Sequence, residues 1–334
     1  MVAIDKTVSQ SLDLLRFPLS ILVVYLHIDS IPTIETLQFD WLADAWLSLY
    51  YIIAILIVNL ARIAVPCFFF ISGFLFFANT DNLTIRSYLK KLQRRVKSLL
   101  IPYILWNILG AVYLYTTQHI FCDSFSALFW APANFPLWFL RDLIGIVIIS
   151  PLCYWLIRYL KIVGLVLMTI LFVSNALQSL GICLFSSFFF FYIGAYCGCN
   201  RVVTKGNNKY LYAVFLLLWC ITFLLYGTAM NQYFMAIFLL VGVFSFLNFS
   251  YTLTTKHVKI LAILSSSSFF IYVAHKLGAT YIAKSIFEIL PDGSYVMSLR
   301  FLIAPFLATF ICVAIYKAWR KFSPSTLSIF LGRK

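Results

Sequence analysis

Long apolar runs alternate with short polar stretches along the chain, and none of the runs shows the strict one-in-two alternation of a membrane β-strand. A helix needs roughly twenty apolar residues to cross the hydrocarbon core of a bilayer. The pattern predicts an all-α, polytopic membrane helix bundle with about ten transmembrane helices, in a single domain of residues 1–334. The predicted spans are residues 12–30, 50–78, 98–117, 137–157, 162–179, 183–199, 210–228, 232–250, 260–282 and 299–319.

The composition agrees with this interpretation. The chain is 63% hydrophobic and 11% charged, whereas a soluble domain is about half apolar and a quarter charged. The first thirteen residues are polar and no small-residue cleavage site follows the first run, so we expect a retained first helix rather than a signal peptide. The eight cysteines lie mostly in apolar runs and form no C-x-x-C pair, which favours buried small side chains over a metal site.

The net charge of +14 comes from cations that gather in a few loops. With ten spans, the cations of 81–97, 201–209, 256–259 and 317–334 all fall on the side of the N-terminus, and most acidic residues fall on the other side. Cytoplasmic loops of membrane proteins carry an excess of lysine and arginine. We therefore predict that both termini are cytoplasmic and that nucleic acid is not a partner.

The segment 83–97 is amphipathic as a helix. Leu83, Tyr88, Leu89, Leu92 and Val96 fall near one face, and basic residues cover the rest. One interpretation is a cytoplasmic helix lying on anionic headgroups. The other is a positively charged rim that gathers an anionic cofactor from the cytosol.

The first span carries an arginine and a histidine, and ionisable residues inside a bilayer usually have a function. Arg16 and His27 are eleven positions apart, which turns a helix by about 1100° and places both on one face, about 16 Å apart along the axis. The simpler alternatives are that Arg16 snorkels to headgroups beside Asp13 and that His27 is an interfacial histidine.

Further polar residues interrupt later spans. Arg62 lies between apolar runs on both sides, followed by Ser72 and by Gly73, which permits close helix packing. Arg141 and Asp142 begin the fourth span, and because neighbours on a helix do not face each other, we expect Arg141 to pair with another group.

Two more candidates lie near these residues. Trp138 stands one turn before Arg141, where an interfacial aromatic belt is the simpler alternative. In the ninth span, Ser268, Tyr272 and His275 share one stripe that should face the bundle. The histidines and arginines of these spans are expected in one bundle at mid-to-external depth.

These residue types suggest a chemistry. A histidine that titrates near neutral pH suits removal of a proton from a hydroxyl, and arginines suit an oxyanion or a phosphate. No His-rich spacing indicates a metal site, and the sequence holds neither a Gly-rich phosphate loop nor a G-x-S-x-G elbow. His119 and His257 are expected to be solvated.

Five motifs occur in an order that resembles the bacterial integral-membrane acyltransferase family 3. They are "SLDLLRFPLSILVVYLH", "RIAVPCFFFISGFLFF", "YLKKLQRRVKSLLIPYILW", "PLWFLRDL" and "SSFFIYVAHKL", and the resemblance extends over nearly the whole chain. Members of this family attach acetyl or other short acyl groups to hydroxyls of cell-surface glycans, lipids and related compounds.

The resemblance implies a multi-pass O-acyltransferase of the bacterial inner (cytoplasmic) membrane. It would take acetyl-CoA or another short acyl-CoA from the cytoplasm and acylate a hydroxyl of a cell-surface or exopolysaccharide glycan or a lipid-linked sugar, without a metal. Other surface-polysaccharide biosynthesis proteins are expected as partners, and the extracytoplasmic hydrolase-like domain of some members is not expected here. The resemblance matches Arg16 and His27 directly and Arg62 loosely. Together with the polar residues above, the predicted site is catalytic His27, Arg62 and Arg141, cofactor-binding Arg16, Arg94, Arg95 and Ser72, and substrate-binding Trp138, His275 and Tyr272.

In this hypothesis Arg16 and the cations of 86–97 hold the cofactor's phosphates, its pantetheine arm follows the face of the first span, and His27 is the base. Two alternatives are kept. Intramembrane arginine and histidine also mark transport paths, so a polysaccharide or lipid-linked sugar transporter or flippase is the runner-up, although no inverted repeat supports it. A non-catalytic scaffold leaves the aligned Arg16 and His27 unexplained.

Overall fold

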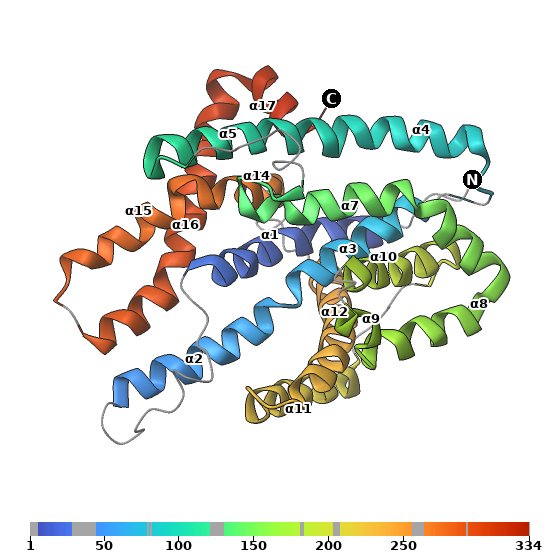
Figure 1. The fold of residues 1–334 in the computed structure, drawn as a ribbon, viewed down its shortest axis with the longest axis horizontal. Coiled ribbons are helices and arrows are strands. Elements are labelled where there is room, and N and C mark those ends of the chain that lie inside the picture. Colours follow the sequence, from blue (N-terminus) through green and yellow to red (C-terminus); the bar gives the residue numbers. More distant parts are fainter. Residues whose placement is uncertain are drawn as a thin grey trace.

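The computed structural model describes residues 6–28, 45–78, 80, 82–120, 130–180, 184–202, 208–255, 264–291 and 293–333. All regular elements in these segments are helical (Figure 1), which confirms the all-α prediction. The first half contains α1 (Lys6–Ile28), α2 (Ala45–Ala61), α3 (Ala64–Phe77), α4 (Ile85–Arg95), the π-turn η2 (Val96–Leu100), α5 (Ile101–Gln118), the 3₁₀ turn η3 (Phe135–Leu137), α7 (Trp138–Ile148) and α8 (Ser150–Val173). The second half contains α9 (Ala176–Ser179), α10 (Leu184–Cys199), α11 (Lys209–Leu224), α12 (Asn231–Thr255), α14 (Ser268–Ala274), the π-turn η4 (His275–Ala279), α15 (Thr280–Ser285), η5 (Ile286–Ile289), α16 (Ser294–Phe322) and α17 (Pro324–Phe330).

Within the described residues, six helical stretches are long and apolar enough to cross a membrane, and the shorter apolar helices α10 and α11 accompany them. Large apolar side chains also remain exposed on the outer faces, including Val166 and Ile170 of α8, Leu217 of α11 and Phe310 of α16. Lipid tails would cover such a surface, which water would not favour. The chain is therefore a multi-pass membrane protein, while the count of ten spans and the cytoplasmic termini stay predictions.

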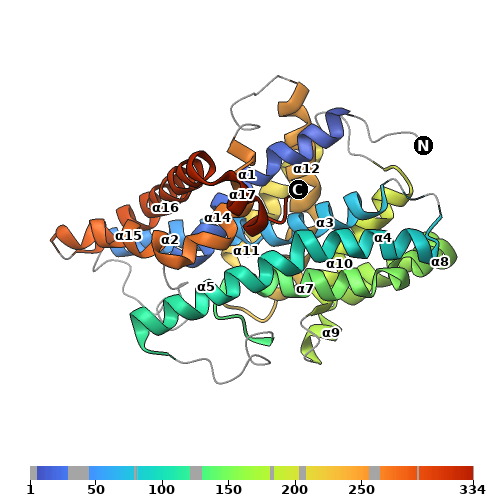
Figure 2. The same cartoon turned by 90° about the horizontal axis from the view of Figure 1, so that it is seen from above.

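The predicted second span is two helices rather than one. α2 ends at Ala61 and α3 starts at Ala64, with a turn at Arg62 and Ile63 between them. The predicted amphipathic segment and third span are joined instead: α4, η2 and α5 form one long rod (Figure 2). Along the segment 83–97, Leu83, Tyr88 and Leu92 pack against the core, whereas Leu89 and Val96 are exposed.

Helix α8 spans the predicted boundary between the fourth and fifth runs. Lys161 has φ 48° and ψ −126°, which no helix residue adopts, and the chain turns back there at the right-hand edge of Figure 1. The predicted break at residues 158–161 thus coincides with a reversal of the chain. Cys122, Cys183 and His257 lie outside the described residues.

The centre of the bundle is the pair α3 and α10, which pack closely along their length (Figure 1). A Cβ added to Gly73 or Gly194 would collide with a backbone carbonyl oxygen of the facing helix, that of Phe191 or of Phe70. A Cβ on Gly198 would lie 2.6 Å from the carbonyl oxygen of Phe74. The expectation that Gly73 permits close helix packing is confirmed, and small residues at helix contacts are typical of membrane bundles.

We predict that Gly194→Ala lowers the thermal stability of the purified protein, because the added methyl group must push α3 and α10 apart. Overpacking of this kind costs about 1–3 kcal/mol. The matched control is Gly145→Ala on α7, where an added Cβ meets nothing within 4 Å. Thermal unfolding in detergent checks this, and equal melting temperatures for the two variants would contradict it.

Candidate functional site

Two histidines from distant parts of the chain meet at the end of α1. The rings of His27 and His275 are stacked, with centroids 5.3 Å apart and an interplanar angle of 28°. Phe135 contacts the His27 ring edge-on at 5.7 Å. The expectation that polar residues of the first and ninth spans face the same interior therefore holds for this pair.

The hydrogen bonds of His275 determine its proton arrangement. Its Nδ1 lies 3.0 Å from the carbonyl oxygen of Ile271 and 2.9 Å from that of Tyr272, and carbonyls only accept, so Nδ1 must donate. In the neutral ring, Nε2 is then an acceptor. This atom is fully buried and has no hydrogen-bond partner among the described residues. The site therefore contains a fixed imidazole with an open lone pair.

The backbone departs from α-helix directly after His275. The π-turn η4 contains Leu277 at φ −87°, ψ 47° and Gly278 at φ 109°, a conformation that glycine adopts most easily. Single π-turns within helices are frequent at functional sites. This break ends α14 beside the pocket that His27 lines.

That pocket, here called the histidine pocket, has a volume of about 430 Å³ and is polar on much of its wall. It is lined by the ends of α1 and α5, by the approach to η3, and by η4, α15 and η5. Two cations and one carboxylate line it: Lys276, Lys284 and Glu288. His27 lines the pocket directly, whereas His275 is fully buried behind it.

Asn134 also lines the histidine pocket, and the sequence analysis missed it. Its Nδ2 donates to the carbonyl oxygen of Val273 at 2.8 Å, while Oδ1 is buried without a partner in the described chain. Asn134 is 1% exposed, so its open acceptor is unusual. The sequence signal that could have indicated it is an amide side chain two residues before Pro136, just ahead of the predicted fourth span.

Tyr272 and Trp138 support this region without lining the histidine pocket. The Tyr272 hydroxyl donates to the carbonyl oxygen of Pro136, and its ring meets Phe139 edge-on at 5.6 Å. Trp138 begins α7 and packs against the core. Tyr272 thus ties α14 to the turn that carries Asn134.

A second polar region, here called the basic cluster, contains Arg16, Lys91, Arg94 and Arg95. Arg95 interacts electrostatically with Arg16, and Lys91 with both Arg94 and Arg95. Arg16 also pairs with Asp13 at 2.8 Å, as the simpler alternative expected. Both α1 and α4 therefore contribute cations to this cluster.

Lys91 also ends α3. Its Nζ donates to the carbonyl oxygen of Phe76 and to Oγ1 of Thr80, and it lies 4.8 Å from the centroid of the Phe76 ring. Beside Thr80 opens a basic pocket of about 550 Å³ that Arg158, Lys161 and Arg201 also line. Ser72 lies partly buried on α3 and lines neither this pocket nor the histidine pocket.

The remaining two predicted catalytic residues lie outside the histidine pocket. Arg141 pairs with Asp142, its Nη2 lying 2.8 Å and its Nε 3.0 Å from Oδ1. The expectation of a different partner was wrong, because the long arginine side chain folds back onto its neighbour and also donates to the carbonyl oxygen of Trp130. Arg62, at the turn between α2 and α3, lines a separate pocket with residues of α8, α10 and α12.

Within the described segments, no group of three or more histidine, cysteine, aspartate or glutamate side chains could hold a metal ion.

Comparison with known proteins agrees with the geometry. A family model described as an acyltransferase domain matches residues 9–317. The chain belongs to the acyltransferase 3 family. It is also 29% identical over 182 residues to the succinoglycan biosynthesis protein ExoH of Rhizobium meliloti (strain 1021), an alignment that covers 49% of this chain and 47% of that protein. The match thus spans about half the length of this curated relative, and no solved structure matches the acyltransferase at a significant level.

We predict that the histidine pocket opens on the side of the membrane opposite the basic cluster. A cysteine introduced by Lys284→Cys, at the pocket wall, should react with a membrane-impermeant maleimide in intact cells. Lys90→Cys, on the exposed face of α4, should react only after the membrane is permeabilised. Labelling of both variants from the same side would contradict the predicted orientation.

Proposed function

We propose that this acyltransferase moves an acetyl or other short acyl group from cytoplasmic acyl-CoA to a hydroxyl of a cell-surface or exopolysaccharide glycan or a lipid-linked sugar. The observation that carries the proposal is the stacked pair of His27 and His275 at a polar pocket. His27 lies near the end of α1, and the same helix contributes Arg16 to the basic cluster. The similarity to a succinoglycan biosynthesis protein supports a glycan acceptor.

His27 is the base in this proposal, because it lines the pocket where an acceptor hydroxyl can reach it. His275 is fully buried, and its Nδ1 proton is held by two carbonyl oxygens. It is therefore assigned as a positioning residue that fixes the His27 ring by stacking. The Oδ1 of Asn134 is an open hydrogen-bond acceptor on a residue that lines the pocket, and the Nε2 of His275 is a second one behind it. A substrate hydroxyl or a water could donate to such an atom.

The basic cluster would hold the donor. CoA carries several phosphate groups, and arginine binds phosphate oxygens with paired hydrogen bonds. Arg16 and His27 lie on one uninterrupted helix, eleven residues and about 16 Å apart, with Pro18 inside it. That separation is comparable to the length of the pantetheine arm. Arg94 and Arg95 would add charge at the phosphate end.

The reaction would proceed as a direct transfer. The acceptor O–H gives its proton to His27, its oxygen forms a bond to the acyl carbon, and the C–S bond of the thioester breaks. The CoA thiolate then takes the proton from His27, which returns the ring to its starting state. A nearby cation would stabilise the oxyanion that forms on the carbonyl oxygen.

Lys276 is the better placed cation for that role. It lines the histidine pocket and its charge interacts with both histidine rings. Arg62 and Arg141 line other parts of the protein, so contact of either with the reacting carbonyl would need a rearrangement. Arg141 instead links α7 to the carbonyl oxygen of Trp130, which precedes the turn that carries Asn134.

We predict that His27→Ala lowers acyl transfer from acetyl-CoA, and the slow hydrolysis of acetyl-CoA, by about 10²–10⁴-fold while leaving acetyl-CoA binding intact. Purified protein in nanodiscs, assayed for free thiol release and for binding, provides both values. His119→Asn is the matched control, since His119 is an exposed histidine with φ 55° at the end of α5 and asparagine tolerates that conformation. An active His27→Ala protein would remove His27 from the mechanism.

We further predict that Arg16→Ala weakens acetyl-CoA binding without changing the turnover of bound donor, because Arg16 contacts only the phosphate end. The two effects separate in a titration of turnover against donor concentration, as a raised KM at unchanged kcat. If wild-type protein binds no acyl-CoA and neither variant differs from it, the enzyme proposal fails. A transporter of glycans or lipid-linked sugars then becomes the leading function.

A further inference from the structure

Arg62 is a cation in an apolar stretch that lacks a compensating carboxylate. It stands at the turn between α2 and α3, is half-buried, and forms no ion pair or side-chain hydrogen bond with any described residue. The hydroxyl group of Tyr226 lies close enough to interact with its charge. A buried charge is costly unless it is paired.

The two other predicted site arginines within the spans are both paired. Arg16 binds Asp13, and Arg141 binds Asp142 and a backbone carbonyl oxygen. Arg62 therefore differs from these two arginines in having no ion-pair or hydrogen-bond partner for its side chain among the described residues. Its guanidinium donors remain available to a ligand.

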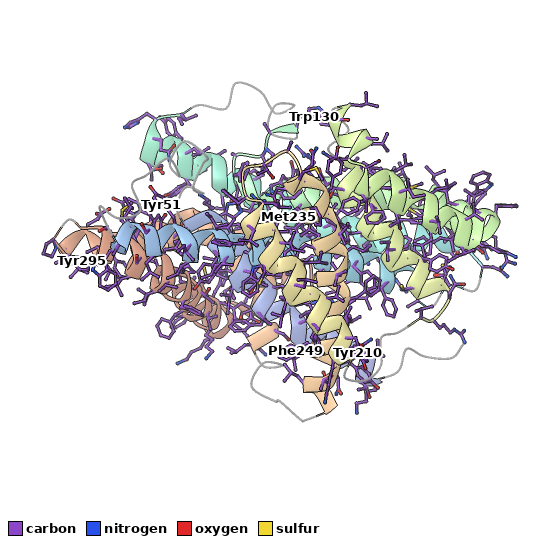
Figure 3. The ribbon with its side chains drawn as sticks, turned by 90° about the horizontal axis from the view of Figure 1, so that it is seen from below. Tyr51, Trp130, Tyr210, Met235, Phe249 and Tyr295 are labelled. Atoms are coloured by element: carbon purple, nitrogen blue, oxygen red, sulfur yellow. The ribbon has the colours of Figure 1, made fainter. Side chains whose placement is uncertain are left out.

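Arg62 lines a pocket of about 390 Å³, here called the amide pocket, whose polar wall comes mainly from uncharged side chains. None of the lining residues is acidic. Figure 3 labels Met235, which also lines this pocket, near the middle of the view, and Trp130, whose carbonyl oxygen accepts from Arg141, toward its upper edge. The polar lining residues are Asn175, Ser186, Thr228, Asn231 and Gln232.

One of these amides is held by a side-chain hydrogen bond, and another has an oxygen without a hydrogen-bond partner. Asn175 has φ 57° and its Nδ2 donates to Oε1 of Gln232 at 2.9 Å. The Oδ1 of Asn231 is buried without a partner among the described residues. Asn231 is also the first residue of the 25-residue helix α12, so the pocket lies against the N-terminal part of that helix.

We propose that the amide pocket binds an oxyanion carried by a glycan, with Arg62 on the carboxylate or phosphate and the amide side chains on neighbouring sugar hydroxyls. An arginine without an ion pair selects negative charge. Side-chain amides both donate and accept, which suits hydroxyl groups. A neutral sugar would leave the Arg62 charge unpaired, so an acidic unit is favoured.

The inference rests on the proposed function only in naming the glycan as the acceptor. The amide pocket and the histidine pocket share no lining residue. The anionic group bound at Arg62 is therefore not the hydroxyl that is acylated. Arg62 would select and hold the acceptor at a distance from the reacting atoms.

The test measures binding to the full chain in nanodiscs made of neutral lipid only, so that anionic headgroups do not compete. The probes are tetragalacturonate, which carries carboxylates, a polyprenyl diphosphate, which carries phosphates, and cellotetraose, which is neutral. We expect one anionic probe to bind at least about tenfold more tightly than cellotetraose. The probe that does so tells a carboxylated sugar from a lipid-linked diphosphate.

Arg62→Gln should abolish that preference and Arg62→Lys should retain part of it, because lysine keeps the charge but loses the planar donors. Asn231→Asp should also abolish it by adding a negative charge. Arg320→Gln, at an exposed arginine near the end of α16, is the matched control and should bind as wild type does. Thermal unfolding of each variant excludes misfolding as the cause.

The inference is overturned if wild-type protein binds no anionic probe better than cellotetraose, or if Arg62→Gln and wild type bind it equally. Acetyl-CoA hydrolysis by the same samples keeps the two proposals apart. Loss of anion binding by Arg62→Gln, beside acetyl-CoA hydrolysis by the wild-type protein, supports both. Arg62-dependent binding in a protein that never hydrolyses acetyl-CoA supports the anion site and counts against the transferase.

Discussion

The rigid rise of a single α-helix sets the distance between the two polar regions of this protein. Each residue of α1 adds about 1.5 Å, so Arg16 and His27 are held about 16 Å apart on the same face whatever the loops do. The basic cluster forms around one of these residues and the histidine pocket around the other. A long, thin donor with phosphates at one end and a reactive thioester at the other fits this separation, whereas a compact ligand would reach only one end.

Three polar residues of these pockets and of the histidine pair lie where regular helices are interrupted. Arg62 stands at the turn between α2 and α3, Lys161 at the reversal of α8, and His275 at the π-turn that follows α14. In a bilayer, irregular backbone is tolerated where protein or a polar cavity covers it. The close glycine packing of α3 on α10 supplies the rigid centre against which these breaks can be held.

Spacing within one element could be predicted from the sequence, and side-chain partnerships between elements could not. The alignment of Arg16 with His27 and the close approach of Gly73 follow from helical geometry alone, and both were predicted. The contact of His27 with His275 joins residues about 250 positions apart, and the sequence indicated only that both face the interior. The pairing of Arg141 with Asp142 was predicted wrongly, since the helical rule concerns Cβ directions and ignores how far a flexible guanidinium reaches.

The same reasoning explains why Asn134 was missed and why Arg62 was assigned to the wrong neighbourhood. The carbonyl oxygen of Val273 on α14 holds the amide of Asn134 and leaves Oδ1 open. The local pattern before Pro136 could have marked the amide, but not this contact between distant segments. Arg62 was grouped with His27 as a catalytic residue because both were expected at mid-to-external depth. Depth in a membrane is one coordinate, however, and the break after α2 presents Arg62 to α8, α10 and α12 instead. Two polar pockets on different sides of one bundle would let the protein separate recognition of an acidic acceptor from the chemistry on its hydroxyl.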